Sequence, residues 1–320
     1  NSAFKVSYQH PGRFDGQPTA RYNAQPDALL FKERQGCFVV NKGSGKASIK
    51  CPESSRIVKV KNNLKMTDGP CRGLPKMRVV PQGGGKITVE FYGSYSRNCG
   101  QKRLFNVGLF ATTWKMWQSM GGSVQGGFLQ GRTPSNARLV HTHYSKPLRD
   151  IIPTVNKKSN NVMARQLLLS IGQKQNGVGT INGGVQAMKK WFASRGLHFP
   201  ELRIENGSGL SRQSRVSASS IAKLLDDAYR SPYRNDFVRS LAILGVDGTL
   251  KRRMKNTPVR GRGQFKTGTL RNVRGIAGYV KARNGQTYIV SVLHNDPKAR
   301  SRALRAHNAV IKWAFDGGRM

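Results

Sequence analysis

Three strand-like runs and a helix-like run near the C-terminus constrain the fold more than any other feature of this sequence. Residues 263–269, 273–283 and 287–295 have strand-like composition, and Asn284-Gly285 joins the last two runs. An Asn-Gly pair tolerates positive φ at both turn positions, so it is a strong hairpin signal. Residues 298–316 then have helical spacing. The sequence predicts a three-stranded meander followed by a final helix.

The middle of the chain predicts a mixed α/β body. Helices are expected at 159–172, 182–195 and 217–230, and Ser159 is expected to cap the first of them. A largely buried helix is expected at 107–120, because its apolar spacing is helical and Gly121-Gly122 follows it.

The first third of the chain has a different pattern. Short β-like runs at 36–41, 56–60, 77–80 and 86–94 are separated by Gly, Pro, Asn and Asp, which predicts an all-β module. A length of 320 residues suggests about two domains. We therefore expect a β-rich domain over 1–104 and a second domain over 105–320. No run approaches the roughly 18 apolar residues that a membrane-spanning helix requires.

All four cysteines lie in the β-rich third. Cys37, Cys51, Cys71 and Cys99 show no CxxC spacing and no clustered histidines, so no metal is expected. Two disulfides in an oxidising compartment are the favoured interpretation, with four buried free thiols as the alternative. Of the three possible connectivities, the local pairs Cys37–Cys51 and Cys71–Cys99 are favoured.

The chain is strongly basic. Lysine and arginine number 55 against 15 acidic residues, a formal charge of +40. Nucleic acid, anionic membrane and acidic cell-wall polymer would all be attracted to such a surface. The basic residues are scattered through every segment, however, and no basic arm is present, so nucleic acid is not the expected partner.

Two short motifs in the second domain could carry chemistry. Ser159-Asn160-Asn161 lies at a predicted helix start, and Lys266-Thr267-Gly268 lies on a predicted strand. Each motif alone is weak, because a capping serine, a surface asparagine and a solvated strand lysine are all common. Together, in this order, they resemble the SxN and KTG motifs of penicillin-binding proteins and serine β-lactamases.

The flanking residues sharpen this likeness. They resemble the D-alanyl-D-alanine carboxypeptidase/endopeptidase family of class C penicillin-binding proteins. The matching stretches are 143–148, 156–164, 206–212, 245–250 and 265–270, with a looser likeness at 22–29 to the family's inserted β domains. The resemblance implies an α+β fold: a transpeptidase-like domain with an antiparallel sheet flanked by helices, plus a β-rich insertion.

The resemblance also implies roles for individual residues. Ser159 would relay a proton to the leaving amine, and Asn161 would bind the substrate amide. Lys266 would place positive charge beside the serine and the substrate carboxylate. Thr267 would donate a hydrogen bond to that carboxylate, and Gly268 would let the substrate lie against the strand edge. The Thr269 N–H would help to form the oxyanion hole.

The family's nucleophile lies in an SxxK motif upstream of SxN. The two literal matches here are Ser2–Lys5, in a polar terminus, and Ser220–Lys223, which follows SxN, and we reject both. Because the first residue is Asn1, we expect a truncated chain whose missing part carries a signal peptide and the true SxxK. The alternative is a degenerate homologue that binds wall peptide without cleaving it.

The resemblance implies a periplasmic serine D-Ala-D-Ala carboxypeptidase/endopeptidase that acts on peptidoglycan stem peptides through an acyl-enzyme. It would be acylated by β-lactams, need no cofactor and be inactive as this fragment alone. Arg212 is a weaker candidate for binding a substrate carboxylate, with Phe4 lining the same subsite, and Arg271 stands where relatives carry a polar residue such as glutamine. The competing hypothesis is a non-catalytic basic module that binds wall polymer, membrane or nucleic acid.

Overall fold

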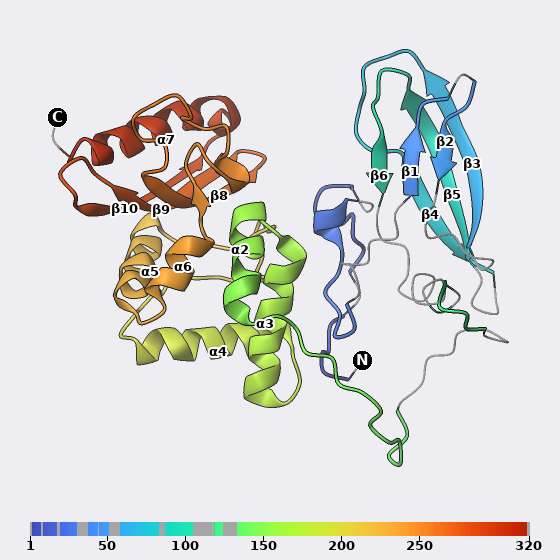
Figure 1. Ribbon diagram of the computed structural model, residues 1–320, viewed down its shortest axis with the longest axis horizontal. Coiled ribbons are helices and arrows are strands. Elements are labelled where there is room, and N and C mark those ends of the chain that lie inside the picture. Colours follow the sequence, from blue (N-terminus) through green and yellow to red (C-terminus); the bar gives the residue numbers. More distant parts are fainter. Residues whose placement is uncertain are drawn as a thin grey trace. The chain divides into compact units, whose positions relative to one another are not determined.

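The computed structural model describes residues 2–7, 9–17, 20–30, 38–43, 45–50, 58–82, 87–104, 117, 119–123 and 133–318. Its contacts divide the chain into two units (Figure 1). One unit holds Val6–Thr142, and the other holds Ser2–Lys5 together with His143–Met320. The expected boundary near residue 104 stays a prediction, because most of 105–132, including nearly all of the helix expected at 107–120, lies outside the described residues.

The described part of the first unit is β-rich, apart from a short 3-10 helix, η1 (Arg21–Asn23). One three-stranded sheet has the order β2-β1-β6, and the other has the order β3-β5-β4. The strands are β1 (Phe38–Asn41), β2 (Ser48–Lys50), β3 (Val58–Thr67), β4 (Lys76–Pro81), β5 (Ile87–Ser96) and β6 (Lys102–Leu104). β3 and β5 pair in parallel, and the other neighbours are antiparallel. The four strands expected from the sequence are confirmed where the structure describes them, whereas β2 and β6 were not anticipated.

The two sheets of this unit share one apolar core. Phe38, Val89, Phe91 and Leu104 are fully buried in it, and the rings of Phe38 and Phe91 meet edge to face at 5.1 Å between centroids. Inward residues alternate with exposed ones along β3, as a strand with one buried face requires.

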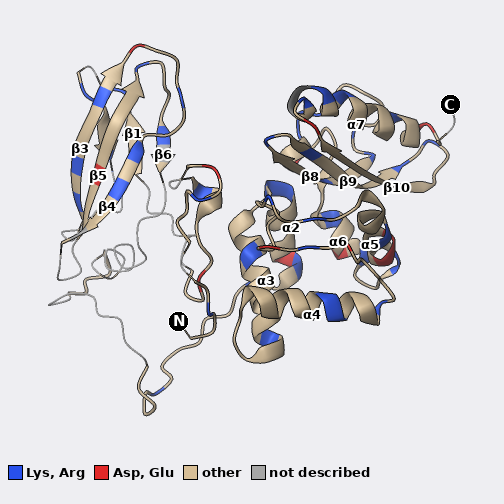
Figure 2. Ribbon diagram, turned by 180° about the vertical axis from the view of Figure 1, so that it is seen from behind, with Lys and Arg blue, Asp and Glu red and all other residues tan. Residues whose placement is uncertain are grey.

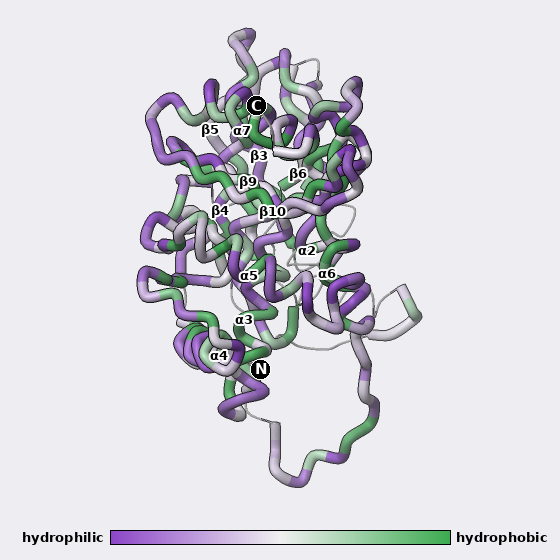
Figure 3. Tube along the Cα trace, turned by 90° about the vertical axis from the view of Figure 1, so that its left-hand side faces the viewer, coloured by the Kyte–Doolittle hydropathy of each residue, from purple (hydrophilic) through white to green (hydrophobic). Residues whose placement is uncertain are grey.

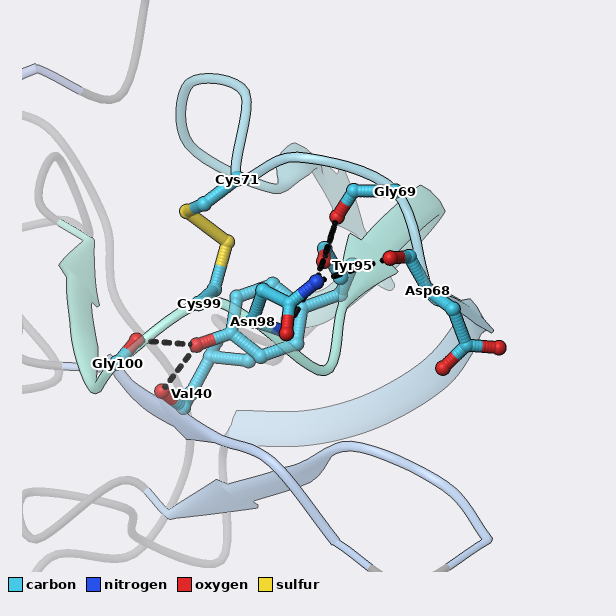
Figure 4. The surroundings of a disulfide bond; sticks show 9 residues. Val40, Asp68, Gly69, Cys71, Tyr95, Asn98, Cys99 and Gly100 are labelled. Atoms are coloured by element: carbon cyan, nitrogen blue, oxygen red, sulfur yellow. Dashed lines mark hydrogen bonds between the residues drawn. A yellow bond between two sulfur atoms is a disulfide. The ribbon is translucent and has the colours of Figure 1, made fainter.

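The disulfide Cys71–Cys99 closes the turn region beside this core (Figure 4). Cys99 is buried, and the hydroxyl of Tyr95 donates hydrogen bonds nearby to the carbonyls of Gly100, at 2.6 Å, and Val40, at 3.3 Å. The predicted Cys71–Cys99 pair is confirmed. The predicted Cys37–Cys51 pair lies outside the described residues.

The second unit contains a four-stranded antiparallel sheet with the order β10-β9-β8-β7. Its strands are β7 (Ala242–Ile243), β8 (Gly263–Leu270), β9 (Val273–Lys281) and β10 (Thr287–Asn295). The predicted meander and its hairpin are therefore confirmed, but the turn differs from the expected one: of Asn284 and Gly285, Gly285 alone has positive φ, at +82°, and the strands pair up to Lys281 and Thr287. β7 pairs only with the start of β8, at Phe265 and Gln264, so no described strand covers the rest of that edge of β8.

Helices cover both faces of this sheet (Figure 1). Alternate residues of β9, including Ile276 and Val280, pack against α7 (Ala299–Phe315), the predicted final helix. The intervening residues, including Tyr279, pack against α5 (Ala218–Arg230) and α6 (Arg234–Ser240). Hydrophobic residues occur along both β9 and β10 (Figure 3). This arrangement is the antiparallel sheet flanked by helices that the sequence resemblance implied.

Three further helices complete the second unit. They are α2 (Leu148–Lys158), α3 (Asn161–Asn176) and α4 (Ile181–Ser194), and a one-turn 3-10 helix, η3 (Gly248–Leu250), follows β7. The helices expected at 159–172, 182–195 and 217–230 correspond to α3, α4 and α5. α2 and α6 were not anticipated; Pro153 interrupts the helical signal of α2.

The expected capping role of Ser159 was wrong. Asn160 is the N-cap of α3, because its side-chain oxygen accepts a hydrogen bond from the N–H of Met163 at 3.0 Å. Ser159 is instead the C-cap of α2. Both residue types favour N-caps, so the position of the preceding helix decides between them.

Among the described residues, no helix combines the length and the apolar character that a membrane crossing requires.

Candidate active site

Ser159 lies in the sharp turn between α2 and α3. Its backbone is left-handed, with φ 51° and ψ 51°, a conformation that is uncommon for a residue with a Cβ. The turn is held by the N–H of Asn160, which donates to the carbonyl of Val155 at 3.1 Å. Residues in such conformations persist where the surrounding structure holds them, and they cluster at functional sites. The turn places the Ser159 hydroxyl toward the sheet.

Lys266, on β8, meets Ser159 across 107 residues of sequence. Its Nζ donates hydrogen bonds to Ser159 Oγ at 2.6 Å and to the carbonyl of Thr267 at 2.7 Å. The structure thus brings together the two motifs that were recognised separately in the sequence.

Burial lowers the pKa of Lys266 from its ordinary value of 10.5 to about 8. The low-dielectric surroundings disfavour the charged form, and no described carboxylate lies within ion-pair distance of it. Below about pH 8 the ammonium is charged, so the site presents a positive charge that an anionic ligand can neutralise. Binding such a ligand would raise the pKa of Lys266 again.

The strand edge beyond Lys266 is open. Thr267 Oγ1 lies 3.0 Å from Thr249 Oγ1 of η3, while Gly268 and Thr269 are exposed. A Cβ placed on Gly268 would meet no atom within 4 Å. The edge therefore has room for an extended ligand, and the roles expected for Thr267, Gly268 and Thr269 stay predictions.

Asn161 occupies the first position of α3, two residues after Ser159, and it is half-buried. Its expected contact with a substrate amide stays a prediction. Thr249, which contacts Thr267, was not assigned a role from the sequence, although it lies in one of the stretches on which the family resemblance depends.

Arg212 lies at the far end of β8. Its Nη1 donates to the carbonyl of Arg271 at 2.7 Å, in the turn that joins β8 to β9. Among the described residues no hydrogen bond joins Arg212 to Ser159 or Lys266, and its expected role in substrate binding stays a prediction. Phe4 forms an isolated β-bridge with Gly179, a residue in the segment that joins α3 to α4. Its role in the same subsite as Arg212 stays a prediction.

An ion pair holds the Ser159 turn against the sheet. Lys157 Nζ lies 2.5 Å from one carboxylate oxygen of Asp247, and the other oxygen accepts the N–H of Ile243 at 2.7 Å. A Cβ on Gly248 would approach the carbonyl of Lys157 to 2.7 Å, so only glycine permits this approach. Sequence analysis assigned no role to Lys157 or Asp247; their flanking positions in the two resembling stretches were the available signal.

We expect Asp247→Asn to lower the free energy of unfolding by about 1–3 kcal/mol, because it leaves the partly buried Lys157 ammonium without its charged partner. Denaturation by urea measures this loss. Asp236→Asn is the matched control, since its pair with Arg239 is more exposed and should contribute less than about 1 kcal/mol. Equal losses in the two variants would contradict a positioning role for Asp247.

The structure supports rejection of both literal SxxK matches. Ser220 is buried in α5, where its Oγ donates to Glu201 Oε1 at 2.7 Å and its N–H donates to the N-cap Ser217. Hydrogen bonds from Ser220 and Ser217 lower the pKa of Glu201 to about 2. Ser2 is exposed in a turn. Ser220 serves the start of α5, and neither serine contacts Lys266.

Positively charged residues outnumber negatively charged residues in this chain. Lysine and arginine occur on strands and helices of both units, with few acidic residues between them (Figure 2). Across the part of the chain that the structure describes, no group of three or more His, Cys, Asp or Glu side chains is arranged to hold a metal ion.

Comparison with known proteins shows which family the chain resembles. The D-Ala-D-Ala carboxypeptidase 3 (S13) family matches residues 1–315. The chain is 33% identical over 190 residues to a D-alanyl-D-alanine carboxypeptidase of an Actinomadura species, an alignment that covers 56% of this chain and 35% of the relative. It is 27% identical over 172 residues to the D-alanyl-D-alanine carboxypeptidase DacB of Haemophilus influenzae, covering 53% and 36%. The matches thus span about a third of the length of these relatives.

The fold also resembles a solved structure. Penicillin binding protein 4 (dacB) from Haemophilus influenzae superposes with a TM-score of 0.80 at 20% identity, covering 98% of this chain and 73% of that chain. A second structure of that protein, complexed with a β-lactam, superposes with a TM-score of 0.75 at 21% identity, covering 93% and 72%. At this identity the likeness establishes the fold.

Proposed function

Because the chain belongs to the D-Ala-D-Ala carboxypeptidase 3 (S13) family, we propose that it supplies the Ser159 and Lys266 part of a serine peptidase site. The substrate is a peptidoglycan stem peptide or cross-link that ends in D-Ala-D-Ala. The observation that carries this proposal is the hydrogen bond from Lys266 Nζ to Ser159 Oγ.

In the proposed reaction, a nucleophilic serine attacks the carbonyl of the penultimate D-Ala. The C–N bond breaks, the terminal D-Ala leaves as an amine, and an acyl-enzyme ester remains, which water then hydrolyses. Ser159 relays the proton that the hydroxyl of the nucleophile releases to the leaving nitrogen, and Lys266 holds Ser159 in place for this transfer. The charge of Lys266 also stabilises the terminal carboxylate of the substrate.

The remaining residues position the substrate. Thr267 donates its hydroxyl to the terminal carboxylate, while Asn161 binds the amide of the peptide. The peptide lies along the exposed edge at Gly268, and the Thr269 N–H stabilises the oxyanion together with the N–H of the nucleophile. Arg212 binds a carboxylate further along the stem peptide. The open edge of β8 supports this arrangement.

The nucleophile belongs to an SxxK segment that these 320 residues do not contain. Neither literal match fits the role, since Ser220 is held by Glu201 and Ser2 contacts neither Ser159 nor Lys266. The chain by itself is therefore inactive. The whole protein is exported to the periplasm, where its substrate and the oxidising conditions for the Cys71–Cys99 disulfide coincide.

Labelled penicillin tests the proposal. The 320-residue chain and a longer form of the protein that includes the SxxK segment are each incubated with the label, and the modified residue is mapped by mass spectrometry. We expect label only on the longer form, at the SxxK serine. Label on neither form would indicate a degenerate binding protein, and label on Ser220 or Ser2 would refute the assignment of the motifs.

The formal charge of +40 supports a second candidate function, binding of anionic wall polymer or membrane by a non-catalytic module. Such binding would weaken steeply with salt and would be indifferent to replacement of Ser159 or Lys266. Penicillin acylation that depends on Lys266 separates the enzyme from this alternative. Nucleic acid is not proposed as a partner, because the basic residues form no continuous arm in the sequence.

A further inference from the structure

A cluster of basic side chains lies on the face of the sheet that α7 covers, the face opposite Tyr279. Arg274 on β9 and His294 on β10 are direct cross-strand neighbours. They continue the alternate positions of Ile276 and Val292, which pack in the α7 core. Two further members, Arg253 and His307, approach from the segment after η3 and from α7.

Several contacts connect these groups. The rings of His294 and His307 lie 5.4 Å apart between centroids, and Arg253 Nε donates to Asn308 Oδ1 of α7 at 2.7 Å. His307 is 1% exposed. The cluster therefore brings together side chains from β9, β10, α7 and the segment after η3.

Each of the four basic residues has one buried nitrogen with no hydrogen-bond partner among the described residues. These atoms are Arg253 Nη2, Arg274 Nε, His294 Nδ1 and His307 Nε2. Buried polar atoms of this kind ordinarily have a partner, and each one left without a partner destabilises the folded state. Four such atoms in one cluster, contributed by separate elements, indicate a common missing partner.

The cluster also lacks a counter-charge. Among the described residues, no carboxylate lies within ion-pair distance of Arg253 or Arg274. Burial and the neighbouring Arg274 lower the pKa of Arg253 to about 10. Burial, Arg253, His294 and Arg274 lower the pKa of His307 to about 4, so His307 is neutral at pH 7.

A depression of about 390 Å³ lies beside the cluster and has His294 in common with it. The residues that line it are His294, Asp296, Pro297, Lys298, Ala299 and Arg302. Asp296 is the one acidic group in this lining, and one of its carboxylate oxygens accepts the N–H of Lys298 at 2.6 Å. The depression gives a small solute access to the imidazole of His294.

We propose that Arg253, Arg274, His294 and His307 form a binding site for a compact tetrahedral oxyanion such as phosphate. A guanidinium forms its strongest hydrogen bonds with oxyanions, and several oxygens in one ion can accept from donors on different elements. Water could satisfy single donors, but it would leave the two guanidinium charges uncompensated. The site lies on the opposite face of the sheet from Tyr279 and does not include Ser159 or Lys266.

Thermal unfolding of the chain in inorganic phosphate tests the proposal, with sodium chloride at equal ionic strength as the reference. A ligand that binds the folded state raises Tm with its concentration. We expect a saturable rise in phosphate, and at least a tenfold loss of phosphate affinity in Arg274→Gln. Lys190→Gln removes the same charge from an exposed position on α4 and should leave phosphate affinity unchanged. Acetate replaces phosphate in a parallel series, to distinguish a carboxylate from a tetrahedral anion.

Two results would overturn the proposal. One is an equal effect of phosphate and chloride on Tm, and the other is a full phosphate effect in Arg274→Gln. If Arg274→Gln does not fold, Arg253→Gln removes the other guanidinium and makes the same comparison. The His307 ring in the unmodified chain provides an independent measurement by NMR: bound phosphate should raise its pKa from about 4 toward 6.5, and no change would count against the site.

Discussion

Replacement of Lys266 by alanine is expected to slow penicillin acylation of the longer protein by at least about a hundredfold. The variant loses the Nζ that donates to Ser159 Oγ and the positive charge beside the proposed carboxylate site. Both losses act in the same step, because proton transfer through Ser159 and stabilisation of anionic charge are required together. The measurement is the second-order rate constant for labelling by a fluorescent penicillin.

Lys158→Ala is the matched control for charge. Lys158 is exposed, ends α2 and lies next to Ser159, so its loss removes one positive charge near the site without breaking the bond between Lys266 and Ser159. We expect Lys158→Ala to acylate within about threefold of the unmodified protein, as a screened surface charge should. If Lys266→Ala acylated at a normal rate, the proposed role of the Ser159–Lys266 pair would be refuted.

The pH dependence of stability gives a second measurement on Lys266 that needs no nucleophile. The pKa of Lys266 is about 8 in the folded chain against 10.5 ordinarily, so the unfolded chain binds more protons between these values. The stability of the unmodified chain relative to Lys266→Met should therefore rise from about pH 8 to pH 10.5. A flat difference over that range would show that the Lys266 ammonium is not desolvated.

Loss of the Cys71–Cys99 disulfide is the second large expected effect, confined to the first unit. The bond closes 28 residues of sequence, and loop closure of that length stabilises the folded state by about 3–4 kcal/mol. A double replacement of both cysteines by alanine should therefore increase hydrogen exchange of the amides in β3 and β5 by about a hundredfold or more. Exchange measured by mass spectrometry reports each unit separately.

The strands β8, β9 and β10 provide the internal control for this experiment, because the disulfide lies in the other unit. Their exchange should be unchanged in the double variant. Alkylation of the unmodified chain after non-reducing denaturation checks the premise, since Cys71 and Cys99 should stay unlabelled. Labelling of both, or equal loosening of the two units, would contradict the expected local role of this bond.

Local patterns in the sequence predicted the elements whose conformation depends on residues that are close together in the sequence. Gly285 supplies the positive φ that the hairpin turn requires, and the helical spacing that predicted α4, α5 and α7 depends on near neighbours. Helix α2 was not predicted because Pro153 weakens its local signal. Tertiary contacts hold it instead, including a hydrogen bond of 2.7 Å from Asn156 to Ser240 and the ion pair from Lys157 to Asp247.

The candidate site also has features that the sequence determined and features that only the tertiary structure decided. By itself, the sequence determined the residue types and the order of the two motifs, and these were sufficient for the family resemblance that the comparison bears out. Only the tertiary structure decided that Ser159 ends α2 in a left-handed conformation and that its hydroxyl meets Lys266. The physical reason is the distance along the chain: capping and turn preferences act over about four residues, whereas the hydrogen bond between Ser159 and Lys266 joins residues 107 apart.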